Sequence, residues 1–312
     1  MTCFIMKPIK VQNIEKSYGK VEAVKGLSFE VKEGELFGLI GPDGAGKTTL
    51  FRILTTLLKP GAGTASVLGL DVVADYKQIR PRVGYMPGRF SLYQDLSVEE
   101  NLSFFASVFG TTVEDNYELI RPIYHQLEPF KDRMAGALSG GMKQKLALSC
   151  ALIHKPQVLF LDEPTTGVDA VSRKEFWQML HHLKEENITI LVSTPYMDEA
   201  EQCDRVALIQ EGRILSVDPP EVITGRFDKE LWAVAAPNKY RLIQLLREYQ
   251  FSDSVQPFGE YIHYTDKRAD FSGQELTTYL EANGISNPEV TNITPDIEDT
   301  FMQLMEQEVA DG

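Results

Sequence analysis

The amino-acid sequence predicts an α/β protein of two domains, a large one over residues 1–225 and a small one over residues 226–312. The first observation is length, because 312 residues exceed the usual size of a single domain. The second is that short apolar, strand-like runs alternate with helical patterns through most of the large domain. The third is a polar, proline-containing stretch at 218–229, after which the alternation resumes. We therefore expect a linker there, with an α/β fold on either side of it.

The composition is that of an ordinary globular protein, with 43% hydrophobic and 24% charged residues. No apolar run approaches the roughly 20 residues that cross a bilayer, and the patch at 3–6 is too short for the core of a signal peptide. A net charge of −14 opposes non-specific attraction to nucleic acid or anionic lipid. Cys3, Cys150 and Cys203 lack C-x-x-C spacing, which argues against disulfides or a zinc site. We expect a cytoplasmic chain, without a nucleic-acid partner, that contacts a membrane only through another protein.

The stretch from Leu36 to Leu58 carries the strongest chemical signal. An apolar run ends at Ile40, the next eight residues read G-x-x-x-x-G-K-T, and apolar residues then recur at helical spacing. In a strand-loop-helix this pattern predicts a phosphate-binding loop; a glycine-rich turn with a solvated lysine is the weaker alternative. The glycines let backbone N–H groups point inward, Lys47 supplies a positive charge for the β- and γ-phosphates, and Thr48 offers a hydroxyl to Mg²⁺. The predicted ligand is a nucleoside triphosphate, bound by Gly41, Pro42, Asp43, Gly44, Ala45, Gly46, Lys47, Thr48 and Thr49.

Around this loop the pattern predicts a mixed sheet with an antiparallel patch and a helical insert. Strand-like runs at 9–14 and 27–31 form the patch, which is expected to lead into the main sheet. The insert spans about 96–150 and opens with a capping box at 97–100. A later helix of the insert opens at Ser139, a natural N-cap whose neighbouring N–H groups can also receive a phosphate. A simple helix cap is the alternative interpretation of that serine.

A second chemical signal lies at 158–163, where a continuous apolar run ends in Asp162 and Glu163. This is typical of a buried parallel strand that delivers two carboxylates at its C-terminal end. Two adjacent acids at a strand end are often only solvated turn residues, but beside a phosphate-binding loop they predict a catalytic pair. We expect Asp162 to hold Mg²⁺ through water, together with Thr48. Glu163 is expected to polarise the attacking water as the catalytic residue.

The small domain shows no chemical motif. Strands and helices are predicted there in alternation, at 231–236, 238–249, 260–264, 273–281 and 289–293. A last helix is expected after Pro295. His263 lies in an alternating run and is interpreted as an ordinary sheet residue. We expect a small α/β accessory domain for dimerisation or regulation, without a site of its own.

In order and spacing, these motifs resemble the ATP-binding subunits of ABC transporters over about the first 220 residues. Gly41–Thr48 resembles the Walker A motif, Val158–Glu163 the Walker B motif, and Gly167–Asp169 the D-loop that carries Asp169. Tyr18, which its own context shows only as a turn tyrosine, matches the aromatic residue that stacks on adenine. The resemblance implies ATP and Mg²⁺ as ligands. It also implies a signature that acts on ATP bound to a partner, formed by Leu138, Ser139, Gly140, Gly141 and Met142.

Longer phrases are similar to multidrug exporters of the ABC-2 type. They are Gly-Tyr-Met-Pro at 84–87, Leu-Tyr-x-Asp-Leu-Ser-Val-x-Glu-Asn-Leu at 92–102, Ser-Thr-x-Tyr-Met-Asp-Glu-Ala-Glu at 193–201 and Thr-Pro-Asp-Ile-Glu-Asp-Thr-Phe at 294–301. The resemblance implies two partners. One is a separate ABC-2 type membrane permease, and the other is a second ABC ATP-binding subunit or domain that dimerises head to tail with this chain.

Two positions depart from the family's pattern. Gly88 stands where the Q-loop has glutamine, and Pro195 stands where the switch histidine follows Ser-Thr. Neither residue has a hydrogen-bonding side chain for the γ-phosphate, Mg²⁺ or the attacking water. The loss of both side chains beside one phosphate predicts a degenerate site with low intrinsic activity. A homodimer would carry this defect twice, so we expect a heterodimer.

We therefore expect an ATP hydrolase subunit that energises a separate permease for efflux, as the degenerate-site member of a heterodimer. The alternative is an ATP-binding regulatory or assembly protein with little hydrolysis, which the losses at Gly88 and Pro195 also favour. A soluble ATPase of DNA repair or translation is a third class. The sequence has no long coiled-coil heptads, second P-loop or basic excess to indicate that class.

Overall fold

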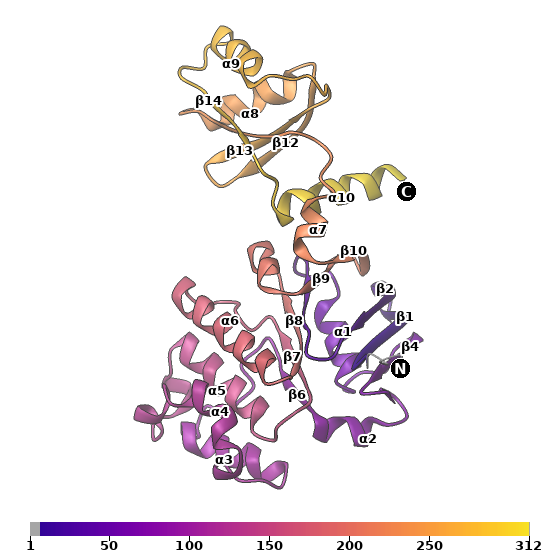
Figure 1. Ribbon diagram of the computed structural model, residues 1–312, viewed down its shortest axis with the longest axis vertical. Coiled ribbons are helices and arrows are strands. Elements are labelled where there is room, and N and C mark those ends of the chain that lie inside the picture. Colours follow the sequence, from indigo (N-terminus) through magenta and orange to yellow (C-terminus); the bar gives the residue numbers. More distant parts are fainter. Residues whose placement is uncertain (1–6, 312) are drawn as a thin grey trace. The chain divides into compact units, whose positions relative to one another are not determined.

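The computed structural model describes residues 7–311, with side chains to residue 307, so Cys3 lies outside the described residues. The chain divides into two compact units, 1–220 and 221–312 (Figure 1). The boundary thus lies at 220/221 rather than at the predicted 225/226, and part of the expected linker is the short helix α7 (Pro220–Thr224). Proline suits the first turn of a helix, where its missing N–H leaves no bond unmade. None of the helices described is long and apolar enough to cross a membrane.

The main sheet of the first unit is mixed, in the order β10-β9-β3-β8-β7-β6, which confirms the predicted fold class. Its strands are β3 (Leu36–Ile40), β6 (Val83–Met86), β7 (Val158–Asp162), β8 (Thr189–Thr194), β9 (Arg205–Gln210) and β10 (Arg213–Asp218). All neighbours pair in parallel except β9 and β10. The central strands β3, β7 and β8 are buried along their whole length, which explains the apolar runs at 36–40, 158–161 and 190–192.

The antiparallel strands form a sheet of their own, in the order β2-β1-β4-β5, and β2 leads through a turn into β3 of the main sheet, as expected. Its strands are β1 (Ile9–Tyr18), β2 (Val21–Val31), β4 (Ala62–Val67) and β5 (Leu70–Asp71). One apolar core joins both sheets to helix α1 (Lys47–Leu54). Phe29 and Phe37, one from each sheet, stack with ring centroids 5.3 Å apart. The start of α1 is therefore held between two layers.

The helical insert contains α3 (Val98–Val108), α4 (Tyr117–Tyr124) and α5 (Gly140–Leu152), which lie together in Figure 1. The capping box at its start is present: Glu100 N–H donates to Ser97 Oγ at 3.1 Å, and Ser97 N–H donates to Glu100 at 2.7 Å. A short helix, α2 (Tyr76–Ile79), precedes the insert, and α6 (Ala170–Glu185) follows it.

In the second unit, after α7, three described helices accompany an antiparallel sheet in the order β12-β13-β11-β14. Its elements are β11 (Leu231–Ala235), α8 (Lys239–Glu248), β12 (Ser252–Phe258), β13 (Tyr261–Asp266), α9 (Gly273–Ala282), β14 (Glu289–Ile293) and α10 (Ile297–Asp311). The sequence analysis missed β12, whose polar run contains Pro257. It is an edge strand of this sheet, the position in which proline is tolerated.

Candidate functional site

At two positions in the loop between β3 and α1, the neighbouring backbone leaves room only for glycine. A Cβ at Gly41 would lie 2.1 Å from the carbonyl oxygen of Ile209 on β9. A Cβ at Gly46 would lie 2.3 Å from the carbonyl oxygen of Ala23 on β2, and φ at Gly46 is +103°. Strands from both sheets thus press the loop into a tight curve ahead of α1. A curve of this kind, opening onto the first N–H groups of a helix, fits a phosphate group.

Lys47 is fixed at the base of this loop. Its side chain is almost fully buried, and Nζ donates to the carbonyl oxygens of Gly41 at 2.7 Å and Pro42 at 2.9 Å. Nζ also lies 3.1 Å from Oε1 of Glu163. The lysine therefore joins the glycine loop to the acid pair at the end of β7. Its positive charge stands where a triphosphate on the loop would need it.

Asp162 and Thr48 bring two oxygens together at the same place. Thr48 Oγ1 donates to Asp162 Oδ1 at 3.2 Å, and Ser193 Oγ donates to the same oxygen at 2.8 Å. Burial raises the pKa of the Asp162 carboxyl, while the hydrogen bonds from Ser193 and Thr48 oppose that rise. A hydroxyl and a carboxylate are the hard oxygen ligands that Mg²⁺ prefers. Mg²⁺ held by Thr48 and Asp162 would neutralise phosphate charge during transfer.

Glu163 has an unusual backbone for a glutamate, with φ of +52°. Its N–H donates to both the carbonyl oxygen and Oγ of Ser193, at 3.0 and 3.1 Å. These bonds hold the strained turn that directs the carboxylate to Lys47. The catalytic candidate is therefore positioned by β8 as well as by its own strand.

The predicted signature begins a helix and packs against the predicted D-loop of the same chain. Ser139 is exposed and caps α5, with Met142 N–H donating to its Oγ at 3.3 Å. A Cβ at Gly141 would lie 2.7 Å from Ser172 Oγ, which in turn donates to Asp169 at 2.8 Å. Asp169 caps α6, and hydrogen bonds from Ser172 hold the pKa of its carboxyl below the usual value. None of the hydrogen bonds described for Ser139 and Met142 reaches the glycine loop of this chain.

Three further predicted nucleotide contacts make no described contact with the acid pair. Tyr18 is 46% exposed at the end of β1, Asp43 is exposed, and Thr49 is half-buried on α1. No hydrogen bond is described for these three side chains, and adenine stacking by Tyr18 stays a prediction.

Of the two departures from the family pattern, Gly88 borders the acid pair and Pro195 follows the end of β8. A Cβ at Gly88 would lie 2.9 Å from the carbonyl oxygen of Asp162, so the chain after β6 runs directly against the end of β7. Pro195 follows Thr194, whose carbonyl oxygen accepts the N–H of Gly41 at 3.2 Å. Neither position presents a polar side chain to the place where Lys47, Asp162 and Glu163 meet.

Glu199 belongs to this neighbourhood, and the sequence analysis did not single it out. It is 4% exposed, and its Oε2 accepts the hydroxyls of Thr194 at 2.5 Å and Thr165 at 3.0 Å. Its Oε1 has no hydrogen bond among the described residues and lies 3.8 Å from the guanidinium of Arg173, too far for a hydrogen bond. Arg173 also lies over the ring of Tyr196, 4.8 Å from its centroid. One buried carboxylate thus links the end of β8, the turn after the acid pair, and α6.

Comparison with known proteins gives consistent matches. The family model described as ABC transporter matches residues 24–166. The probable multidrug ABC transporter ATP-binding protein YbhF of Escherichia coli (strain K12) is 39% identical over 95% of this chain, which spans 52% of that relative, about half its length. The Nod factor export ATP-binding protein I of Burkholderia orbicola (strain AU 1054) is 36% identical over 97% of this chain and 99% of its own. A dimeric ATP-binding cassette in a post-hydrolysis state, bound to ADP and Pi, has a TM-score of 0.61 at 25% identity, over 68% of this chain and 98% of that one.

Proposed function

Because the chain belongs to the ABC transporter family of ATP-binding proteins, we propose that it is the ATP-binding subunit of an exporter. It binds Mg-ATP at the glycine loop and drives a separate ABC-2 type permease. The observation that carries this proposal is the convergence of Lys47, Glu163, Asp162 and Thr48, joined by contacts of 3.1 and 3.2 Å. Export is supported by the two relatives, one a probable multidrug transporter protein and the other a Nod factor export protein.

The site built on this chain's own loop turns ATP over slowly. Gly88 borders the acid pair and Pro195 follows the end of β8, and neither side chain offers a hydrogen bond. Contacts to the attacking water and γ-phosphate each contribute orders of magnitude to a rate. Ser139 and Gly140 remain exposed and intact. In a head-to-tail heterodimer these two residues complete a competent site on the partner, while this chain retains its ATP and keeps the dimer closed.

An apolar groove supports contact with a membrane permease. It has a volume of about 410 Å³ and is bordered by Phe105 and Val108 of α3, by Phe109 directly after α3, by α5, and by the segment 83–87. Val108 is 60% exposed and Phe109 37% exposed, which is unusual for neighbouring large apolar side chains unless a partner covers them. The segment 83–87 leads directly to Gly88. A permease helix seated in the groove would therefore lie next to the chain that borders the acid pair.

The competing function is an ATP-binding regulator or assembly protein with little hydrolysis, and the observation in its favour is the same pair, Gly88 and Pro195. The two functions differ in what a partner subunit does. As an exporter subunit, this chain should stimulate ATP turnover by the partner through Ser139. As a regulator, it should bind ATP without changing the partner's rate.

The test compares steady-state ATPase rates of the purified chain, of a second ABC ATP-binding subunit, and of their mixture. We expect Ser139→Arg in this chain to abolish the stimulated rate of the mixture, because a large charged side chain would replace the hydroxyl that caps α5. Glu163→Gln in this chain should reduce that rate much less. Ser286→Arg, at an exposed position of the second unit, is the matched control. Rapid turnover by the chain alone, lost with Glu163→Gln, would refute the proposal.

A further inference from the structure

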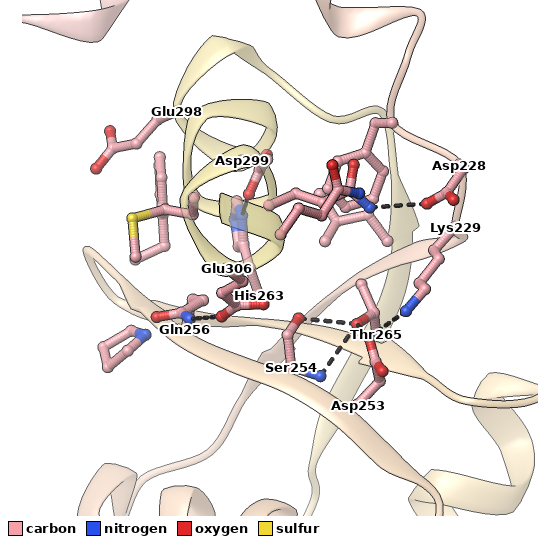
Figure 2. Close-up of a pocket in the computed structure, with 17 residues that line it drawn as sticks. Asp228, Lys229, Asp253, Ser254, Gln256, His263, Thr265, Glu298, Asp299 and Glu306 are labelled. Carbon is pink, nitrogen blue, oxygen red and sulfur yellow. Dashed lines mark hydrogen bonds and ion pairs between the residues drawn. The ribbon is translucent and has the colours of Figure 1, made fainter. Parts of the chain in front are cut away.

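The second unit contains a cavity of about 320 Å³ between its sheet and α10, shown in Figure 2. Side chains alternate along β13: Ile262 and Tyr264 enter the apolar core beneath α8 and α9. His263 and Thr265 therefore point to the opposite face, where they line the cavity. A volume of this size suits a small organic molecule. The unit that the sequence predicted to lack a site thus has a hollow lined by polar side chains.

The wall of this cavity carries an excess of negative charge. Its one lysine, Lys229, lies 2.5 Å from the carboxylate of Asp253 and is neutralised by it. Asp228 accepts the side-chain amide of Gln303 at 2.7 Å, and Glu306 accepts that of Gln256 at 2.9 Å. An amide donor satisfies a carboxylate without cancelling its charge. Two carboxylates at this cavity therefore lack a described cationic partner.

A buried histidine faces the same space with one nitrogen unused. His263 is 8% exposed, its Nδ1 lies 2.6 Å from Oδ1 of Asp299, and its ring stacks on Phe258 at 4.2 Å. The other oxygen of Asp299 accepts the N–H of Asp296 at 3.0 Å, so the carboxylate is fixed and holds the ring in place. No partner is described for Nε2 among residues 7–307. Because His263 lines the cavity, this nitrogen is placed to contact a molecule bound there.

The remaining wall decides the class of ligand. Phe227, Phe258 and Met302 provide aromatic and thioether surfaces, on which a cation gains from the negative face of a ring. No group of three or more potential metal ligands occurs among the described residues, which disfavours a bare metal ion. We propose that this cavity binds a small organic cation, with its charged end at Asp228 and Glu306 and its apolar body against Phe258 and Met302. The ring of His263, fixed by Asp299, forms the wall beside it.

Binding of benzyltrimethylammonium to the full-length chain tests this inference. The probe keeps its charge at every pH, and benzyl alcohol and phenylacetate serve as the neutral and anionic comparisons. By calorimetry we expect the cation to bind at least tenfold more tightly than either comparison. The double variant Asp228→Asn/Glu306→Gln should weaken cation binding at least tenfold. Glu248→Gln/Glu281→Gln, which removes two exposed charges from α8 and α9, should leave it unchanged.

An NMR measurement keeps the inference testable should the double variant fold poorly. Titration of the wild-type chain with the cation should shift the ring resonance of His263, identified by its absence in His263→Phe, more than those of the other four histidines. The inference is wrong if about 10 mM of the cation produces neither a calorimetric heat of binding nor a shift of the His263 resonance. Even a ligand of millimolar affinity would be bound at that concentration. It is also wrong if the chain binds all three probes with the same affinity. The same holds if the cavity double variant and the control double variant lose equal affinity for the cation.

Discussion

Removal of the buried carboxylate at Glu199 should destabilise the first unit. Hydrogen bonds from the hydroxyls of Thr194 and Thr165 to this carboxylate, at 2.5 and 3.0 Å, are each worth about 1.5–3 kcal/mol, as is typical of bonds to charged groups. Opposing them is the cost of burying a charge whose nearest cation, on Arg173, is 3.8 Å away. We therefore expect Glu199→Ala to lower the free energy of unfolding by about 2–4 kcal/mol, and Glu199→Gln by about 1 kcal/mol, because the amide oxygen still accepts both hydroxyls.

Urea unfolding followed by tryptophan fluorescence measures this effect. Trp177 lies buried in α6, whereas Trp232 belongs to the second unit, so a Trp232→Phe background isolates the signal of the first unit. A double-mutant cycle of Glu199→Ala with Thr165→Val should show coupling of at least about 0.5 kcal/mol, as residues in one hydrogen-bond network do. An unfolding free energy for Glu199→Ala within about 0.5 kcal/mol of wild type, or strictly additive variants, would refute the reasoning.

Three further predictions concern the nucleotide site and the histidine beside α3. Lys47→Ala should weaken ATP binding at least tenfold, about 1.4 kcal/mol, and equal affinities by calorimetry would contradict this. Gly88→Ala should lower the free energy of unfolding by about 1 kcal/mol, because its Cβ would lie 2.9 Å from the carbonyl oxygen of Asp162; an unchanged urea midpoint would count against that contact. Burial lowers the pKa of His154 below its ordinary 6.5, so as pH falls below about 6.5 the unfolded chain takes up a proton that the folded chain does not, and stability decreases. His154→Gln should flatten the dependence of melting temperature on pH between about 7.5 and 5.5, and an equal slope in both proteins would rule out His154 as its source.

Local motifs made the centre of the fold predictable. Gly41 to Thr48 and the pair Asp162 and Glu163 are consecutive residues, so each pattern contains its own geometry. The parallel strands of the mixed sheet were also predictable, because strands that are buried on both faces contain runs of consecutive apolar residues. The short edge strand β12 was missed, since its polar, proline-containing sequence resembles a loop.

Contacts between distant residues were not predictable. His263 meets Asp299, 36 positions away, only because β13 and α10 lie on either side of the cavity. Glu199 meets Thr165, 34 positions away, only because β7 and β8 are neighbours in the sheet. A single sequence carries periodicity and motif spacing but no pairing information, so both carboxylates appear in it as ordinary polar residues.

The central claim is that this chain's own site holds ATP and hydrolyses it slowly. The most direct measurement is the identity of the nucleotide that remains on this chain in the proposed heterodimer. The complex is incubated with radiolabelled Mg-ATP for many partner turnovers, separated rapidly from free nucleotide, and quenched in acid. We predict close to one unhydrolysed ATP per complex, retained in the wild type and lost with Lys47→Ala on this chain. ADP at this site, formed at the rate of partner turnover, would contradict the claim.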